Sequence, residues 1–233
     1  MSLDSNVILV DVISGIVDSI RETGSISNVV VTDGISAVTS ANTLNEGDVV
    51  TIAGADYVTY DVTTASFKVE GDVSAGTSWT AKPPYYMYGH PKEIRQRLQE
   101  RDSGPTLKYQ KYPLIALIQD FPEDMTDPEL YAEVKITVVI VGYTKKDYYS
   151  EDRYTNVLKP VLYPIYNDLL EAIFNDSNFW FDPSLTKPKH TKTDRLFYGT
   201  ESVDGNVANQ YADHLDAIEV SNLELRIRNP NTC

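Results

Sequence analysis

Three short clusters in the sequence combine residue types that could carry out chemistry. The first runs from Lys189 to Arg195 and contains acidic, basic and hydroxyl side chains. The second runs from Asp213 to Asp216, where His214 lies between two carboxylates that could bind a metal ion. The third is an acidic segment whose oxygens could bind a hard cation, with Asp120, Glu123, Asp124, Asp127 and Glu129.

None of these clusters has the spacing that its chemistry requires. Residues i and i+1 point apart, so 189–195 is interpreted as a hydrogen-bonded loop. Segment 213–216 lacks a second His or a Cys at ligand spacing, and the acidic segment lacks the Gly and the spacing of a calcium loop. His90 has no Ser, Cys or acid partner in a known pattern, and is interpreted as a capping or packing residue. With no phosphate-binding loop, dinucleotide fingerprint or nucleophile elbow, the sequence predicts no catalytic residue, metal site or cofactor.

The chain is strongly acidic. Its 34 Asp and Glu residues outnumber 20 Lys and Arg residues, for a formal net charge of -14 over 233 residues. This charge opposes binding of DNA phosphates through a basic surface and favours basic partners. The 16 Tyr residues, against 6 Phe, are rings of the type enriched at interfaces. The single Cys233 excludes an intrachain disulfide, and neither a signal peptide nor an apolar run of ~20 residues is expected.

The strongest secondary-structure signal is a strand from Tyr131 to Gly142. Residues of one parity are wholly apolar, which predicts a face in a core: Val134, Ile136, Val138 and Ile140. The other parity is polar first and apolar later: Glu133, Lys135 and Thr137, then Val139 and Val141. We therefore expect one end of this strand to be covered on both faces and the other end on one.

Two further strands are predicted beside it. The apolar run from Tyr112 to Gln119 is typical of a buried neighbouring strand, joined by a loop over Asp120–Pro128. A last strand, Ala217–Arg228, changes the parity of its apolar residues partway along. A period-two pattern that changes parity needs an extra residue, so we expect a bulge near Ser221 and Asn222.

Three helices are predicted around these strands. Apolar residues at helical spacing, after possible N-cap residues, indicate an amphipathic helix over Ser5–Glu22. A short helix over Glu93–Glu100 follows Pro91, with Ile94 and Leu98 facing inward. A third stripe covers Glu151–Asn175 and contains prolines, so a kink or break is expected near Lys159.

Between the first two helices the composition changes. Residues 24–84 are rich in Ser, Thr, Gly and Val, with short β-like runs separated by turn signals. The sequence predicts an α+β fold with helices packed on a mixed or antiparallel sheet, interrupted by a small all-β inserted domain. The expected domains are a discontinuous α/β core formed by 1–23 and 85–233, and a β-sandwich or barrel formed by 24–84.

The second half of the chain, from about 85 to 230, resembles structural proteins of bacteriophages and prophages of Bacteroidetes-type hosts. The similarity lies in the segments YMYGHPKEI (86–94), KYPLIALIQDF (111–121), RYTNVLKPVLYP (153–164), HTKTDRLFYG (190–199), GNVAN (205–209) and DAIEVSNL (216–223). Element order and size are similar to those of tail-terminator or tail-completion proteins. The insert at 24–84 departs from their minimal plan, which leaves terminator, neck, connector and baseplate subunits as alternatives.

The resemblance implies a non-enzymatic virion protein, assembled in the host cytoplasm, that forms a homo-oligomeric ring, usually a hexamer. Its partners would be other tail or neck proteins; DNA would pass through without sequence-specific binding, and no membrane partner is expected. A ring subunit needs two complementary surfaces and no active site. The partly apolar second face of the central strand supplies the candidate subunit-contact residues Glu133, Lys135, Thr137, Val139, Val141 and Tyr143.

A second function class remains open from the sequence. The inserted β domain could recognise a glycan or a surface protein, with Trp79 and nearby Tyr residues forming a carbohydrate-binding groove. In that interpretation the rest of the chain is a scaffold.

Overall fold

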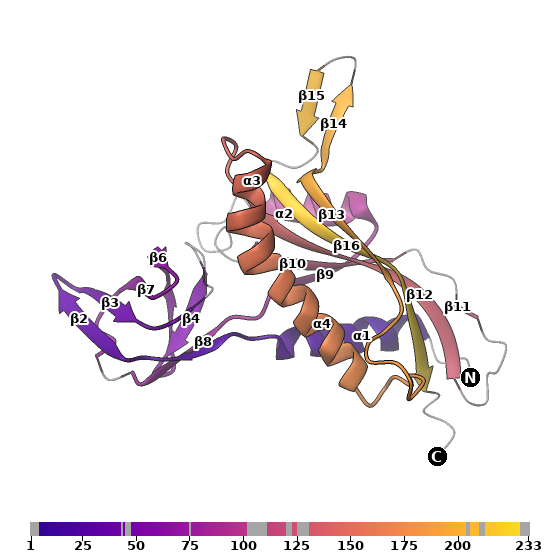
Figure 1. The fold of residues 1–233 in the computed structure, drawn as a ribbon, viewed down its shortest axis with the longest axis horizontal. Helices are drawn as coiled ribbons and strands as arrows, with labels where there is room; N and C mark the ends of the chain where they lie inside the picture. Colours follow the sequence, from indigo (N-terminus) through magenta and orange to yellow (C-terminus); the bar gives the residue numbers. More distant parts are fainter. Residues whose placement is uncertain are drawn as a thin grey trace.

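The computed structural model describes residues 5–42, 44, 48–74, 76–101, 111–119, 123–124, 131–203, 206–209 and 213–228. The fold is α+β, as predicted, with a mixed sheet packed with helices and two small antiparallel sheets near the N-terminus (Figure 1). The small sheets belong to the segment between the first helix and strand β9.

The mixed sheet is six-stranded, with the order β13-β16-β12-β10-β9 and the short β11 paired to β12. Strands β9 and β10 are parallel, whereas the other pairs are antiparallel. Its strands are β9 (Tyr85–Gly89), β10 (Leu114–Ile118), β11 (Glu123–Asp124), β12 (Tyr131–Tyr143), β13 (Thr191–Tyr198) and β16 (Leu215–Arg228). The central strand is the one expected, and β10 is its buried neighbour.

One face of this sheet is covered by helices α1 (Ser5–Ser19) and α4 (Tyr163–Asn175), which lie side by side in Figure 1. The expected apolar stripe of α1 is buried, with Leu9, Ile13 and Val17 fully inaccessible. They join one large core with Val134, Ile136, Val138 and Ile140 of β12. Burial of each such side chain contributes up to roughly 1.5–3 kcal/mol, so α1 is held by the large sheet.

Among the described residues, the opposite face is covered at one end only, by α2 (Pro91–Arg101). Ile94 and Leu98 of α2 are buried, as predicted, and pack in a second core that includes Val139 and Val141. At the other end of β12 this face is open, with Glu133 partly exposed and Lys135 exposed. The predicted asymmetry of the central strand is therefore confirmed.

The predicted bulge in the last strand is also confirmed. Ile136 pairs with Leu223 and Val138 with Val220, so the single residue between them on β12 opposes both Ser221 and Asn222. Asn222 has a φ of 51°, a left-handed conformation that Asn tolerates better than most residues. Because of the extra residue, the apolar side chains before the bulge and those after it all pack in the same core.

The third helical stripe is continuous through its prolines. Helix α3 (Ser150–Arg153) leads directly into a π-helical segment, η2 (Tyr154–Leu162), and then into α4. Pro160 lies inside η2, and the N–H of Tyr163 bonds to the carbonyl of Leu158, five residues back. The wider turn accommodates the proline, so the chain stays helical past Lys159 and the alternative of a break is wrong, whereas the alternative of a kink stays a prediction. It also changes which residues face inward, so that Val157 is buried and Tyr154 is exposed.

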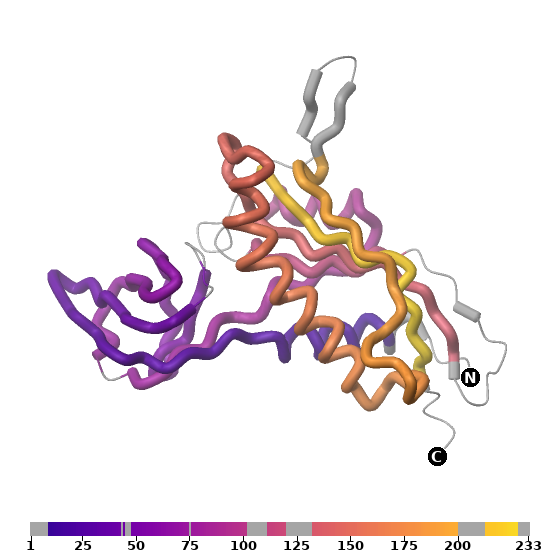
Figure 2. Tube along the Cα trace, in the orientation of Figure 1, coloured from indigo at the N-terminus to yellow at the C-terminus, as the bar shows by residue number. Residues whose placement is uncertain are grey.

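The segment 23–81 forms two four-stranded antiparallel sheets, with orders β1-β8-β4-β5 and β2-β3-β7-β6. The strands are β1 (Thr23–Ser25), β2 (Asn28–Thr32), β3 (Ile35–Thr39), β4 (Val49–Ile52), β5 (Ala55–Val58), β6 (Tyr60–Thr63), β7 (Ser66–Glu70) and β8 (Ser78–Ala81). Both sheets contribute to one apolar core, where Phe67 meets Trp79 edge to face. Figure 2 shows the two chain segments that connect this unit to the rest.

Several strands outside the segment 23–81 were not predicted, namely β9, β11, β13, β14 and β15. Strand β9 lies in the Tyr-rich run before Pro91, for which no strand is predicted from the sequence. Strand β13 occupies most of the segment interpreted as a loop. A short hairpin, β14 (Thr200–Val203) with β15 (Asn206–Asn209), follows β13.

Candidate functional site

The 189–195 cluster is not a loop, because Thr191–Arg195 form part of strand β13 and pair with β16. Arg195 forms an ion pair with Glu219 across the strands at 3.0 Å, and Lys192 pairs with Asp194 on its own strand. His190 precedes the strand and bonds to the Tyr166 hydroxyl at 2.6 Å. These contacts connect β13 to its neighbours.

The 213–216 cluster is divided between two structural ion pairs. The Asp213 carboxylate accepts hydrogen bonds from the Lys111 ammonium at 2.6 Å and the Tyr112 hydroxyl at 3.1 Å. Asp216 pairs instead with Arg153. Within the described part of the chain, no three His, Cys, Asp or Glu side chains gather as a metal-binding group. Of the acidic segment, only the backbone of Glu123 and Asp124 is described, as β11; the rest lies outside the described residues.

His90 caps a helix, as expected. Its carbonyl accepts the N–H groups of Glu93 and Ile94, and its ring Nδ1 accepts the N–H of Lys92 at 3.2 Å. These are N–H groups of the first turn of α2, which have no partner inside the helix. The imidazole therefore satisfies a helix terminus.

The candidate contact residues of β12 lie in three different environments. Glu133 and Lys135 form ion pairs with Arg226 and Glu224 of β16, at 2.7 and 2.9 Å. The partly buried Thr137 lies opposite the bulge. Val139 and Val141 are only 4% and 3% exposed. A side chain that α2 of the same chain already covers has no area left for a second copy. Of the six residues, Tyr143 presents the largest apolar surface, since it is 55% exposed.

Tyr143 begins the loop that connects β12 to α3, residues 143–149, and this loop is fixed by a buried arginine. The Arg153 side chain donates from Nε to the Tyr148 carbonyl at 2.9 Å and from Nη2 to the Lys145 carbonyl at 3.4 Å. At the start of the loop, the Thr144 N–H bonds to the His214 carbonyl at 2.9 Å. The backbone of the loop is thus fixed from beneath; Thr144 is buried and Tyr148 partly buried, while the other side chains of the loop are exposed.

The same arginine forms the deepest ion pair of the described residues. Arg153 Nη1 lies 2.8 Å from Asp216 Oδ1, and the two side chains are 1% and 0% exposed. Asp216 Oδ1 also accepts the Phe197 N–H at 3.0 Å, and the guanidinium lies 3.8 Å from the centre of the Phe197 ring. Within the described residues, Asp216 Oδ2 has no hydrogen-bond partner. Arg153 is therefore the main compensation for a buried carboxylate charge.

Aromatic side chains are exposed around this ion pair. Tyr149 is 81% exposed, the highest value among the large apolar residues described, and Tyr154 and Phe197 are each 46% exposed. Phe197 has a φ of 55°, at the irregular end of β13. This surface is not apparent in the sequence because its residues come from three separate segments. Arg153 and Asp216 are 63 positions apart, and no local pattern connects them.

A cleft of the described structure lies where the β unit meets the helices, with a volume of about 790 Å³. Its acidic residues are Asp18, Glu22, Asp48, Asp56 and Asp168, whereas Lys82 is its single basic residue. Five prolines and three tyrosines form much of the remaining wall: Pro83, Pro84, Pro113, Pro160, Pro164, Tyr85, Tyr86 and Tyr112. The cleft is thus acidic and has flat apolar walls.

Two of its carboxylates have shifted pKa values. A hydrogen bond from Thr51 and the neighbouring Lys82 lower the pKa of Asp56. Partial burial raises the pKa of Asp168, and the nearby charge of Glu171 raises it further. The cleft therefore contains one carboxylate with a cationic partner and another whose charge the fold disfavours.

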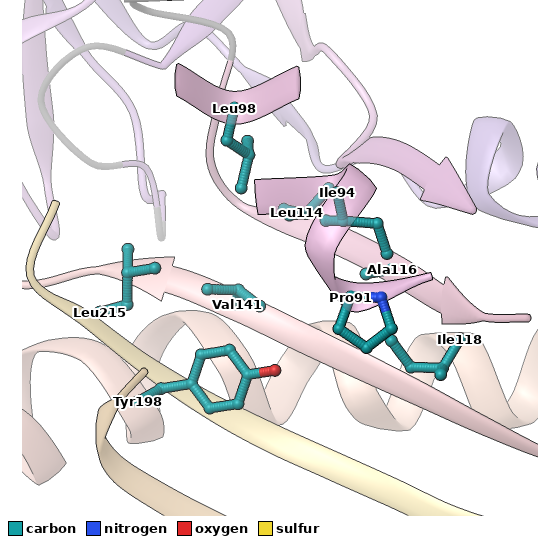
Figure 3. Close-up of a pocket in the computed structure, with 9 residues that line it drawn as sticks. All are labelled: Pro91, Ile94, Leu98, Leu114, Ala116, Ile118, Val141, Tyr198 and Leu215. Carbon is teal, nitrogen blue, oxygen red and sulfur yellow. The ribbon is translucent and has the colours of Figure 1, made fainter. Parts of the chain in front are cut away.

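A second cavity beneath α2 is a packing gap. Figure 3 shows the apolar side chains that surround it, including Ile94, Leu114 and Val141, together with Tyr198. Its volume of about 10 Å³ is close to the minimum for one water molecule, and its walls are apolar. It has no room for a ligand.

The proposed carbohydrate groove does not contain Trp79. This side chain is 1% exposed, and its indole N–H donates to the Ser40 hydroxyl at 2.8 Å. A buried indole cannot stack on a sugar, so Trp79 is a core residue of the β unit.

No protein-family model matches this sequence, and a comparison with curated proteins finds no significant match. Among the described helices, none is both long and apolar enough to cross a membrane. A function is therefore inferred from the fold, the contacts and the charge of the described residues.

Proposed function

We propose that this chain is a structural virion protein of a phage tail or neck, which forms a ring that completes the tail and joins it to neighbouring proteins. The observation that carries the proposal is the loop 143–149, whose backbone is bonded by the buried Arg153 and whose Tyr143 and Tyr149 are exposed. Exposed aromatic residues on a rigid support are typical of protein interfaces. Around them, the described polar clusters have structural partners and form no reaction centre.

The net charge supports the same proposal. A ring through which DNA passes must not bind the phosphates, and a formal charge of -14 gives each copy a repulsive field. This argument requires carboxylates to face the bore. A ring with a basic or neutral bore would contradict it.

Deletion of the gene from the phage or prophage tests the function directly. The expected result is particles whose heads and tails fail to join or whose tails have irregular ends, seen by negative-stain electron microscopy. Complementation with the intact gene should restore complete virions. Normal particles from the deletion strain would refute the proposed role.

A further inference from the structure

Strand β2 of the β unit has one edge to which no other described strand is paired. It is the outermost strand of its sheet and pairs only with β3. In Figure 1 it lies at the far left of the molecule, on the side of the β unit that faces away from the helices. An unpaired strand edge is a template for a further strand.

The turn between β2 and β3 determines which backbone groups point to the open edge. Asp33 and Gly34 have φ values of 53° and 79°, as in a two-residue type I′ turn, so Thr32 and the first residue of β3 form a hydrogen-bonded pair. Such pairs alternate with non-hydrogen-bonded ones along antiparallel strands, so the N–H and C=O groups of Val29 and Val31 point away from β3. The open edge therefore offers two donors and two acceptors.

The edge of β2 lacks the features that keep other edges of this fold from pairing. Strands β5, β6 and β13 contain the charged residues Asp56, Asp61 and Asp194 respectively, and the pairing of β6 and of β13 is irregular. Strand β2 has the sequence NVVVT, with no charge or proline, and its register with β3 is regular. Charges and irregularities block edge pairing, so β2 without them is competent for it.

Two apolar side chains of the strand are exposed. Val30 is 53% exposed and Val31 is 40% exposed, whereas Val29 packs against the core of the β unit. Val29 and Val31 lie on the same face of the sheet, because they are two residues apart. A strand added at this edge would therefore extend that core and cover Val31.

A second copy of β2 fits the open edge in one antiparallel register. When Val29 of each copy lies opposite Val31 of the other, all open donors and acceptors of both strands are paired. A shift by two residues would place Ser27 or Asp33 opposite one of them instead. The Ser27 N–H already bonds to the Thr39 carbonyl at 2.9 Å, and Asp33 is in the turn. The shifted registers therefore lose hydrogen bonds.

This register also brings no like charges together, although each copy is strongly acidic. The strand is symmetrical in residue type about Val30, so Val30 faces its own copy and Asn28 faces Thr32. The first carboxylate beyond the strand, that of Asp33, faces the uncharged Ser27. Since like charges directly opposite each other destabilise a strand pair, an uncharged and self-complementary edge favours a second copy as its partner.

We infer that two copies of this chain pair through β2, as antiparallel strands related by a two-fold axis at Val30. Their two four-stranded sheets then form one continuous sheet. The contact uses the same surface on both copies, so it joins two chains or two whole rings and does not itself close a ring. It goes beyond the proposed function and gives the β unit a role of its own.

Charged substitutions at Val30 test the pairing. In V30K or V30E two like charges lie opposite each other, so we expect each variant to associate through β2 at least about tenfold more weakly. At a concentration just sufficient for wild type to pair, sedimentation velocity should give each variant half the wild-type assembly mass. An equimolar mixture of V30K and V30E should restore the wild-type mass, since Lys then faces Glu. The control V58K changes a valine that is 41% exposed on the other sheet of the β unit, and should assemble as wild type.

Disulfide cross-linking tests the register. The variant V30C/C233S has one cysteine per chain, because Cys233 is the single native cysteine. Its two thiols face each other in a non-hydrogen-bonded pair, where the Cα atoms are about 4.5 Å apart, a separation that a disulfide spans. Oxidation should give a covalent dimer on a non-reducing gel. The matched variant T32C/C233S is exposed on the same strand but faces position 28 of the other copy, and should stay monomeric on that gel.

The outcomes separate this inference from the proposed function. Wild-type assembly mass for V30K and V30E, or equal cross-linking of the two cysteine variants, would overturn the inference, and the open edge would then have a different partner or none. Either result would leave the ring function standing, because a ring uses other surfaces. Equal loss of assembly in V58K would also overturn the inference. The cysteine variants decide the question if far-UV circular dichroism shows that a charged variant does not fold.

Discussion

Replacement of Arg153 by methionine tests how the loop 143–149 is supported. The change removes the guanidinium from a site where it is 1% exposed and leaves Asp216, which is 0% exposed, with the Phe197 N–H as its remaining described donor. Removal of one partner from a buried ion pair costs about 3–5 kcal/mol. That is a large fraction of a typical unfolding free energy of roughly 5–15 kcal/mol.

A second substitution should recover part of this loss. R153M/D216N removes the buried negative charge while its amide oxygen can still accept the Phe197 N–H. We expect the double variant to be more stable than R153M by about 1–3 kcal/mol, the range of coupling energies for contacting residues. The loop carbonyls of Lys145 and Tyr148 still lose their donor, so wild-type stability is not restored.

Urea unfolding, at concentrations where the chain is monomeric, measures these differences. Far-UV circular dichroism follows the whole fold, while Trp180 and Trp79 report on the large sheet and the β unit respectively. We expect the loss of stability in the unfolding transition of the large sheet, which Trp180 reports. A cost below about 1 kcal/mol for R153M, or a double variant no more stable than R153M, would refute the role assigned to this pair.

Three further substitutions have expected effects on stability, measured by urea unfolding. Gly142→Ala places a methyl group 3.0 Å from Leu162 and should destabilise by roughly 1–3 kcal/mol; an unchanged midpoint would contradict the packing. Asn222→Val puts a β-branched residue at a φ of 51° and should cost about 1–2 kcal/mol, whereas Asn222→Gly should not; equal effects would argue against the bulge. Asp168→Asn should stabilise by about 0.2–0.5 kcal/mol at pH 7, since partial burial and, next, the like charge of Glu171 disfavour the folded carboxylate. Because the pKa of Asp168 is raised on folding, this gain should disappear as the pH falls below the carboxyl range; a gain that persists at low pH would contradict its electrostatic origin.

Local periodicity predicted the elements whose burial follows a simple pattern. The alternation of apolar residues in β12 and the change of parity in β16 predicted two strands and a bulge. The prediction holds because the apolar residues of both strands must lie on the face that packs in the same core. Helix α2 was equally clear, with Pro91 at its start and Ile94 and Leu98 on one face. In these segments the sequence pattern and the tertiary contacts agree.

Elements at sheet edges did not show such a pattern. Strand β13 is mostly exposed and contains Lys192, Asp194 and Arg195. Edge strands often carry such charged side chains, which lack the apolar alternation of a buried strand, so the segment was predicted to be a loop. Strand β9 is a Tyr-rich run that pairs in parallel with a strand more than twenty residues later, and local patterns do not encode such a pairing. Pro160 in η2 and Pro164 in α4 led to the prediction of a kink or a break near Lys159, because the sequence gives no sign of a π-helical turn.

The apolar character of the candidate contact face could be predicted from the sequence, but the element that covers it could not. The apolar part of the second face, Val139 and Val141, was identified correctly as apolar, but its cover is α2 of the same chain. The loop 143–149 is anchored by Arg153, and Arg153 is paired with Asp216, 63 positions later in the chain. A single sequence does not show that these two residues are in contact. Tyr143 is both a predicted contact residue and exposed in the structure.

Native mass spectrometry of the wild-type protein tests the central claim, that this chain assembles as a ring. The chain mass is 26.1 kDa, and a closed ring should give one dominant species at an integer multiple of that mass, sixfold for a hexamer, without a ladder of larger oligomers. A single species at 26.1 kDa, even at high protein concentration and low salt, would contradict the account.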